Sequence, residues 1–286
     1  RHILAFTEPT HGNSYVTNVK LLRRAFLLQA CAMTTGVALA ASPASPLLTM
    51  PQHKGTRPSD VNRKFFENGK ARPFAGNTII SQIPLRTPLS DALTTVRNTL
   101  AAQEFSQCLR LLPPSSYHMT VFEGVIDEQR KPPFWPVEVA KDASVQACTD
   151  YFTERLIDFD LDDEFELRMQ VDDFNVHKDS GATIRLVPAS VQENKKLRDL
   201  RDRLAQRLGI RAPDHDQYGF HISLGYLVKW MTDAQTLEYA AVQQICLTFL
   251  RETLEVFALD APRFCTFNDM LTFDDKFAIG KQPETI

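Results

Sequence analysis

The chain has 286 residues, of which 43% are hydrophobic and 23% are charged, and this composition excludes a disordered or coiled-coil protein. Its 32 Lys and Arg residues against 35 Asp and Glu residues give a net charge of −3, which excludes a protein that coats nucleic acid in bulk. An enzyme that binds a single nucleotide, or the end of an oligonucleotide, remains compatible with this charge.

The N-terminal part of the chain differs from the rest in charge. Its first 72 residues contain ten basic and three acidic side chains. A pair of arginines, Arg23 and Arg24, precedes an uncharged stretch at 25–41 that resembles a twin-arginine export signal and is too weakly apolar for a membrane span. We therefore expect residues 1–41 to direct export to the periplasm or the extracellular space, with no membrane association after cleavage. If they are not a functional signal, we expect a cytoplasmic protein.

Two further segments follow the predicted signal. Residues 42–60 are rich in proline and basic residues and predict a linker. Residues 61–286 contain no Gly/Ser-rich seam and predict one domain. Its four cysteines would permit two disulfides in an oxidising compartment. They stand among apolar neighbours at wide spacing, without a CxxC pair, which favours buried free thiols and no structural zinc site. These cysteines are Cys108, Cys148, Cys246 and Cys265.

Hydrophobic spacing of three and four residues predicts four helices. The third is expected to end at Gly209, and the fourth to begin at Thr232 with a capping box to Gln235. The predicted helices cover residues 89–100, 145–156, 197–208 and 233–252.

Apolar and β-branched runs predict strands between these helices. The strands are expected at 77–83, 117–126, 165–176, 182–187 and 220–228, with several more in 255–279. Hairpins are predicted near Gly181 and Asn268, so the pattern favours an α+β fold with antiparallel sheets over a doubly wound parallel sheet. No Gly-rich phosphate loop is present, which disfavours a dinucleotide or nucleoside-triphosphate enzyme.

Two strands contain the same short motif. His118 is followed two residues later by Thr120, and His221 is followed two residues later by Ser223. Because side chains alternate along a strand, each histidine shares a face with its hydroxyl while apolar residues occupy the other face. A single histidine of this kind is usually structural, but two copies predict two similar halves that face one cleft.

The paired motif predicts a particular chemistry. Two imidazoles supply a general acid and a general base that both titrate near neutral pH. Two hydroxyls supply donors for the non-bridging oxygens of a phosphate. These groups are sufficient for phosphodiester chemistry without a metal.

The motifs and their surroundings resemble the 2H phosphoesterase superfamily, which includes cyclic nucleotide phosphodiesterases and 2′-5′ RNA ligase-like proteins. The segments PFAGNT at 73–78, LPPSSYHMTVFEG at 112–124 and LGIRAPDHDQYGFHIS at 208–223 are similar to a bacterial and fungal branch of unknown function. The resemblance covers roughly residues 61–286. That branch more often has Thr where this chain has Ser223, a change that keeps the hydroxyl.

The resemblance implies a bilobal, pseudo-symmetric fold with two antiparallel sheets lining a central cleft and helices outside. It implies His118 and His221 as the catalytic acid and base, and Thr120 and Ser223 as phosphate-binding residues. Some members have a tyrosine five residues after the second histidine, a place that Tyr226 occupies here. Strict alternation would turn Tyr226 away from His221, but a bulge at Gly225 could re-aim it.

Three weaker candidates complete the predicted site. Phe122 shares the face of His118 and could stack on a base, or could belong to the core. Arg185 could bind a phosphate, or form a salt bridge at the edge of its strand. The triplet Asp214, His215 and Asp216 has metal-like composition, but no distant fourth ligand is visible, so a loop is expected and no metal site is predicted.

The leading hypothesis is a metal-independent phosphodiesterase that hydrolyses cyclic phosphodiesters, either 2′,3′-cyclic phosphates or cyclic nucleotides, and needs no cofactor. Its substrate is expected to be a nucleotide or an oligonucleotide end, and the protein is expected to be a monomer. One alternative is an RNA-end 2′-5′ ligase-like activity. The net negative charge of the chain after residue 72 disfavours it, because binding of long RNA requires a basic channel. The other is a catalytically silent nucleotide-binding module. The motif symmetry leaves open which histidine is the base.

Overall fold

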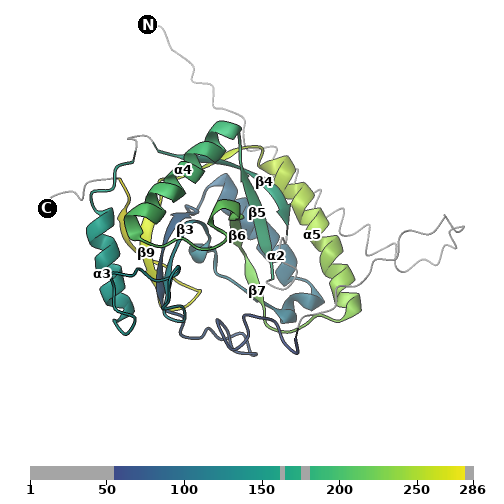
Figure 1. The fold of residues 1–286 in the computed structure, drawn as a ribbon. Helices are drawn as coiled ribbons and strands as arrows, with labels where there is room; N and C mark the ends of the chain where they lie inside the picture. Colours follow the sequence, from purple (N-terminus) through teal and green to yellow (C-terminus); the bar gives the residue numbers. More distant parts are fainter. Residues whose placement is uncertain (1–54, 162–164, 175–180, 281–286) are drawn as a thin grey trace, which may run out of the picture. The chain divides into compact units, whose positions relative to one another are not determined.

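The computed structural model describes residues 55–161, 165–174 and 181–280, all within the compact unit Gln52–Ile286 (Figure 1). The predicted signal at 1–41 and most of the predicted linker lie outside the described residues. Within these ranges, no helix has the length and apolar character that crossing a membrane requires. Residues 55–60, at the end of the predicted linker, contact the domain, since Asp60 is buried and Trp230 donates a hydrogen bond to the carbonyl of Gly55.

Four helices form where the hydrophobic spacing predicts them. They are α2 (Pro88–Ala101), α3 (Val145–Leu156), α4 (Val191–Leu208) and α5 (Asp233–Thr253). A side-chain N-cap starts each helix, and Thr232 with Gln235 forms the predicted capping box of α5. Helix α4 ends at Gly209 in the left-handed conformation, as predicted. Helix α4 begins six residues earlier than its leucine pattern, because its first turns are exposed.

The larger sheet has eight strands, and every neighbouring pair is antiparallel. In spatial order the strands are β10 (Asp274–Ala278), β9 (Arg263–Phe267), β1 (Gly76–Gln82), β3 (His118–Ile126), β6 (His221–Ser223), β5 (Thr183–Pro188), β4 (Leu167–Phe174) and β8 (Phe257–Leu259). A second sheet pairs β2 (Leu109–Leu111) with β7 (Gly225–Leu227). The α+β class with antiparallel sheets is therefore confirmed.

Helices α4 and α5 both pack against the larger sheet. Helix α4 packs against β3, β4 and β5 and against α3, whereas α5 packs against β4 and α2. Figure 1 shows β3, β6 and β5 side by side, with α4 lying across them and α5 along their far side. The apolar residues of the two motif strands, Met119, Val121, Ile222 and Leu224, are fully buried, which follows from the predicted alternation.

Two strand predictions need correction. The single strand expected at 220–228 is two strands in different sheets, β6 and β7, because the chain breaks at Leu224. The two antiparallel sheets that the resemblance implies are also unequal, since one has eight strands with both histidine motifs and the other has two strands. Strand β2 was not predicted, because three residues are too few to show an alternation of apolar and polar side chains. The four cysteines are buried and free, as predicted.

Candidate active site

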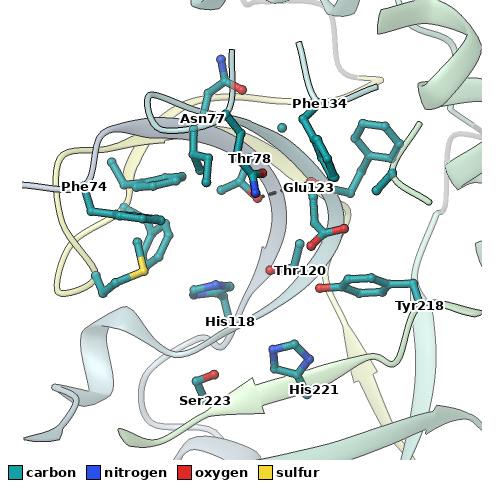
Figure 2. A pocket seen from close by; sticks show the side chains of 18 of the residues that line it. Phe74, Asn77, Thr78, His118, Thr120, Glu123, Phe134, Tyr218, His221 and Ser223 are labelled. Atoms are coloured by element: carbon teal, nitrogen blue, oxygen red, sulfur yellow. Dashed lines mark hydrogen bonds between the residues drawn. The ribbon is translucent and has the colours of Figure 1, made fainter. Parts of the chain in front are cut away.

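The two histidine motifs meet at the middle of the eight-stranded sheet. Strands β3 and β6 are antiparallel neighbours with Met119 opposite Ile222. One step along each strand therefore places each histidine opposite the hydroxyl of the other motif. The resulting cross-strand pairs are His118 with Ser223 and His221 with Thr120. All four side chains line one pocket (Figure 2).

Each histidine ring is held by the same kind of hydrogen bond. Nδ1 of His118 donates to the backbone carbonyl of Ser116 at 2.7 Å, and Nδ1 of His221 donates to the carbonyl of Gly219 at 2.9 Å. A carbonyl oxygen can only accept, so Nδ1 carries a proton in both rings. Nε2 is then the nitrogen that exchanges a proton with a substrate.

Burial determines the charge of one of these rings. It lowers the pKa of His118 to about 4, while the hydrogen bond to Ser116 raises it slightly and the charge of His221 lowers it further. The ring of Phe273 lies edge-on against His118 at a centroid distance of 4.2 Å. His118 is therefore neutral at neutral pH, and its Nε2 can accept a proton.

The two hydroxyls lie in different surroundings. Thr120 is hydrogen-bonded to the hydroxyl of Tyr218, whose pKa is raised by burial, so that the phenol stays protonated. Figure 2 shows the Tyr218 hydroxyl directed at Thr120 from the opposite wall. The hydroxyl of Ser223 forms no hydrogen bond within the described ranges, and this leaves it able to donate to a ligand.

The pocket encloses about 480 Å³ and contains charged residues of both signs. The charged side chains in its lining are Arg63, Lys64, Glu123, Arg201 and Asp214. Burial lowers the pKa of Lys64, but Tyr226 and Asp60 raise it more, so the net direction is upward and the ammonium stays charged. The Arg201 side chain is 1% exposed, and its Nη1 donates to the carbonyl of Val121. These cations favour an anionic ligand.

Tyr226 lines the pocket, and a bulge explains how it gets there. The backbone N–H groups of Leu224 and Gly225 both donate to the carbonyl of Ala182, at 2.7 and 3.2 Å. Two consecutive donors on one acceptor break the alternation at this point. Tyr226 therefore turns to the pocket from β7, where Lys64 lies 4.8 Å above its ring.

The other two predicted binding residues are placed differently. Arg185 lies opposite His221 on β5, but its Nε pairs with Asp172 at 3.2 Å and it is not among the residues that line the pocket. Phe122 lines the pocket, although its ring is buried and lies edge-on to His215 at 6.0 Å. The structure thus supports a salt bridge for Arg185, although it joins two interior strands and does not lie at an edge, and a core position for most of the Phe122 ring.

The sequence reasoning missed two residues that lie inside the quoted motif segments. Glu123 and Tyr218 both line the pocket. Strict alternation would place Glu123 on the face opposite His118, but the register shifts between Ile79 and Ile80, where β3 has one extra residue. This bulge resets the alternation and turns the Glu123 carboxylate into the pocket, as Figure 2 shows. The only sign of this in the sequence is a glutamate three residues after Thr120, at a spacing that alternation alone would place on the other face.

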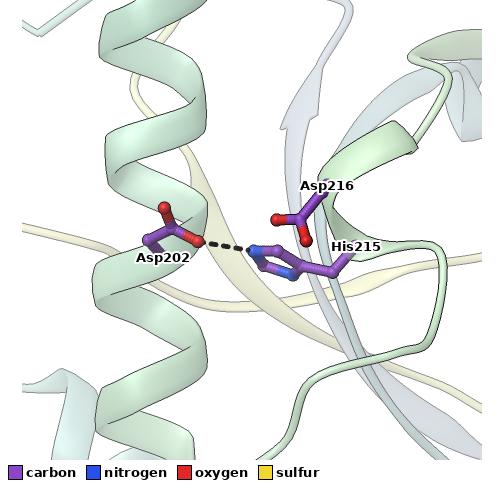
Figure 3. Close-up of side chains that lie close together, drawn as sticks. All are labelled: Asp202, His215 and Asp216. Atoms are coloured by element: carbon purple, nitrogen blue, oxygen red, sulfur yellow. Dashed lines mark hydrogen bonds and ion pairs between the residues drawn. The ribbon is translucent and has the colours of Figure 1, made fainter.

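The metal-like triplet of the sequence is only partly assembled. Asp214 and His215 line the pocket. His215 and Asp216 also lie close to Asp202 of α4, a distant carboxylate that the sequence did not reveal (Figure 3). Nε2 of His215 lies 3.1 Å from Asp202. Arg211 pairs with Asp202 at 2.8 Å and with Asp216 at 2.5 Å. A guanidinium therefore already neutralises both carboxylates, which disfavours a metal ion there.

Comparison with known proteins agrees with this geometry. Residues 64–181 match the family model 2H-phosphodiest, described as a domain of unknown function (DUF1868). The matched range contains the motif of His118 and ends before that of His221. A crystal structure of a conserved protein of unknown function from Agrobacterium tumefaciens is 28% identical, with a TM-score of 0.72 over 80% of this chain and 95% of that chain. No curated protein matches the chain. The resemblance expected from the sequence is thus confirmed: residues 64–181 match a 2H phosphodiesterase-like domain of unknown function.

Proposed function

We propose that this protein is a metal-independent phosphodiesterase that hydrolyses cyclic phosphodiesters, either 2′,3′-cyclic phosphates or cyclic nucleotides. The observation that supports this most is the presence of one imidazole on each of the neighbouring strands β3 and β6, each with Nδ1 hydrogen-bonded to the carbonyl two residues before it. Each ring thus has its proton-exchanging nitrogen fixed by the fold. The match to a 2H-phosphodiesterase-like family supports the same class of reaction.

The charge of His118 suggests how the two roles are divided. Because burial lowers its pKa, His118 is the neutral base that takes a proton from water through Nε2. The water oxygen forms a bond to phosphorus while one bridging P–O bond breaks. His221, protonated on both nitrogens, gives its Nε2 proton to the leaving oxygen. The product is a phosphomonoester with a free hydroxyl, and exchange of protons with solvent restores both rings.

The hydroxyls and cations of the pocket complete the proposed mechanism. Thr120 and Ser223 lie between the two histidines and would donate to the non-bridging oxygens, whose negative charge grows in the transition state. Tyr218, hydrogen-bonded to Thr120, fixes the direction of that hydroxyl. Lys64 adds positive charge to the lining of the same pocket.

We also propose that the domain consists of two pseudo-symmetric halves. The strand order supports this, because β10, β9, β1 and β3 lie on one side of the β3–β6 junction and β6, β5, β4 and β8 on the other. The segment β1–α2–β3 then corresponds to β5–α4–β6, since each is an antiparallel strand pair joined through a helix. An axis through Met119 and Ile222 would exchange the two motifs.

A substrate screen tests this function directly. The four 2′,3′-cyclic nucleotides, 3′,5′-cyclic nucleotides and oligonucleotides with 2′,3′-cyclic ends would be incubated with the full chain in excess EDTA. We expect hydrolysis of at least one class at an undiminished rate, since imidazoles supply both proton transfers. Loss of activity on chelation, with recovery on adding zinc or manganese, would overturn the proposal and point to the cluster of Asp202, His215 and Asp216.

Two further proposals concern the whole protein. We propose that residues 1–41 direct export through the twin-arginine route, supported by Arg23 and Arg24 before an uncharged stretch. We propose that the exported protein acts as a monomer on nucleotides or oligonucleotide ends, because the site is assembled within one chain.

A further inference from the structure

Glu123 places a carboxylate in the pocket at some distance from the two histidines. It follows Thr120 by three residues on β3, a separation of about 10 Å along a strand. Within the described part of the chain, no hydrogen bond or ion pair reaches its carboxylate. Its side chain is exposed to solvent. Partial desolvation and the charge of Asp214 raise its pKa, while the charges of Arg201 and Lys64 lower it without forming an ion pair with it. Glu123 is thus a hydrogen-bond acceptor directed at the space that a ligand would fill.

Several apolar residues line the same pocket as Glu123. They include Gly124, Ile126, Pro133, Phe134, Ile210 and Ala212. Figure 2 shows Phe134 on the side of Glu123 that lies away from His118 and His221. Phe134 is only half-buried, and its ring stacks on no other ring in the described ranges. An aromatic face beside a carboxylate suits a planar ligand that carries N–H donors.

We propose, on the basis of the proposed function, that this end of the pocket is a nucleobase subsite that prefers guanine. The phosphate would lie between His118 and His221, and the sugar would span the distance along β3 to Glu123. The base would then stack on Phe134 and present its edge to the carboxylate.

The preference follows from the donors that each base offers. Guanine has two adjacent donors, N1–H and the N2 amino group, which a carboxylate can bind together. Its neighbouring O6 is an acceptor, and the positive charges of Arg201 and Lys64 near Glu123 complement it. Adenine and cytosine each offer one amino donor beside a ring nitrogen that would repel the carboxylate. Uracil offers one N–H between two carbonyl oxygens, so it should bind most weakly.

The experiment combines binding and turnover on the full chain. Calorimetric titration with 3′-GMP, 3′-AMP, 3′-CMP and 3′-UMP measures binding without reaction. Values of kcat/KM for the four 2′,3′-cyclic nucleotides measure selectivity in the reaction. The test variant is Glu123→Gln, which keeps the shape of the side chain but replaces one acceptor oxygen by a donor. Its thermal midpoint should match that of the unaltered protein.

A second variant separates hydrogen bonding from charge. Asp214→Asn removes a negative charge from the same pocket, so it should strengthen binding of all four nucleotides by a similar factor. Glu123→Gln should instead weaken the binding of 3′-GMP by at least about tenfold and change the binding of 3′-UMP much less, because a bidentate contact is lost only for guanine. In the unaltered protein, 3′-GMP should bind at least about tenfold more tightly than 3′-UMP.

The outcomes distinguish this subsite from the proposed reaction. Equal turnover of the four cyclic nucleotides would overturn the guanine subsite and leave the phosphodiesterase standing. Guanine-selective binding that depends on Glu123, without turnover of any substrate, would support the subsite and overturn the reaction. If Glu123→Gln weakened the binding of all four nucleotides equally, the subsite would be overturned. An absence of nucleotide binding would overturn it as well.

Discussion

His118 and His221 occupy equivalent positions in the sheet, and the surroundings of His118 favour its neutral form. Both donate through Nδ1 to the carbonyl two residues earlier. Burial brings the pKa of His118 down to about 4. This ring is thereby kept neutral, which is the state that the base of an acid–base pair requires.

Removing either histidine should therefore stop most of the reaction. We expect His118→Ala and His221→Ala each to lower kcat by roughly 10²–10⁴-fold, because each removes one proton transfer. The double variant should be little slower than either single variant, since the two rings act together. Single-turnover kinetics with the best substrate of the screen measures this. Small losses that add in the double variant would count against the pair.

The pH dependence of the rate reports the same two rings. Because its pKa is lowered, His118 stays in its basic form until the pH falls to about 4. The acidic limb of kcat/KM should thus lie well below 6.5, the usual value for histidine, and activity should be lost as the pH falls through it. The basic limb reports the acid of the pair and should vanish in a His221→Ala profile. An acidic limb at or above 6.5 would contradict the assignment of the base.

At the level of the elements, two bulges decide which side chains enter the pocket. The register shift between Ile79 and Ile80 turns Glu123 inward from β3. The break at Leu224 and Gly225 moves the chain from β6 to β7 and turns Tyr226 inward. Both are local departures from strand alternation that depend on a neighbouring strand.

Gly181 supports the second of these bulges. Its φ is +109°, and a Cβ there would lie 2.5 Å from the carbonyl oxygen of Gly225 and 2.7 Å from the Cα of Tyr226. We expect Gly181→Ala to lower the free energy of unfolding by about 1–3 kcal/mol, from backbone strain, and to reduce kcat/KM by displacing Tyr226. Urea unfolding of both forms gives the first value.

Gly219 offers a matched control on the same part of the sheet. A Cβ there meets no atom within 4 Å, and its carbonyl still accepts the His221 bond after substitution. Gly219→Ala should therefore change stability little. Equal destabilisation by the two substitutions would show that the close approach at Gly181 is not what matters.

For the whole molecule, the folded domain and the N-terminal segment have separate predicted roles. Among the described residues, those that line the pocket fall within 63–273, whereas the predicted export signal is at 1–41. Changing the signal should thus alter the location of the protein without altering the enzyme. Twin-arginine signals carry folded cargo and are read by a receptor.

Substitution of both Arg23 and Arg24 by Lys should block export and leave an active, folded protein in the cytoplasm. Fractionation of cells, combined with the assay identified in the substrate screen, measures location and activity together. Normal secretion of the doubly substituted protein would contradict the twin-arginine interpretation. A cytoplasmic product without activity would indicate that folding itself depends on the signal segment or on export.

The sequence by itself determined the elements and the central chemistry. Periodicity and capping residues set the four helices, because those signals are local and Leu89, Leu197 and Thr232 act within one or two turns. The repeated motif likewise identified His118 and His221, since alternation on a strand needs no knowledge of partners.

Only the tertiary structure decided which residues surround those histidines. The pairing of β3 with β6 depends on contacts 103 residues apart, and the bulges that admit Glu123 and Tyr226 arise from pairing with β1 and β5. Arg185 lies on the same face of the sheet as the site, yet it forms an ion pair with Asp172 on the neighbouring strand β4. Such features follow from register and from competition between partners, which no local pattern of residues records.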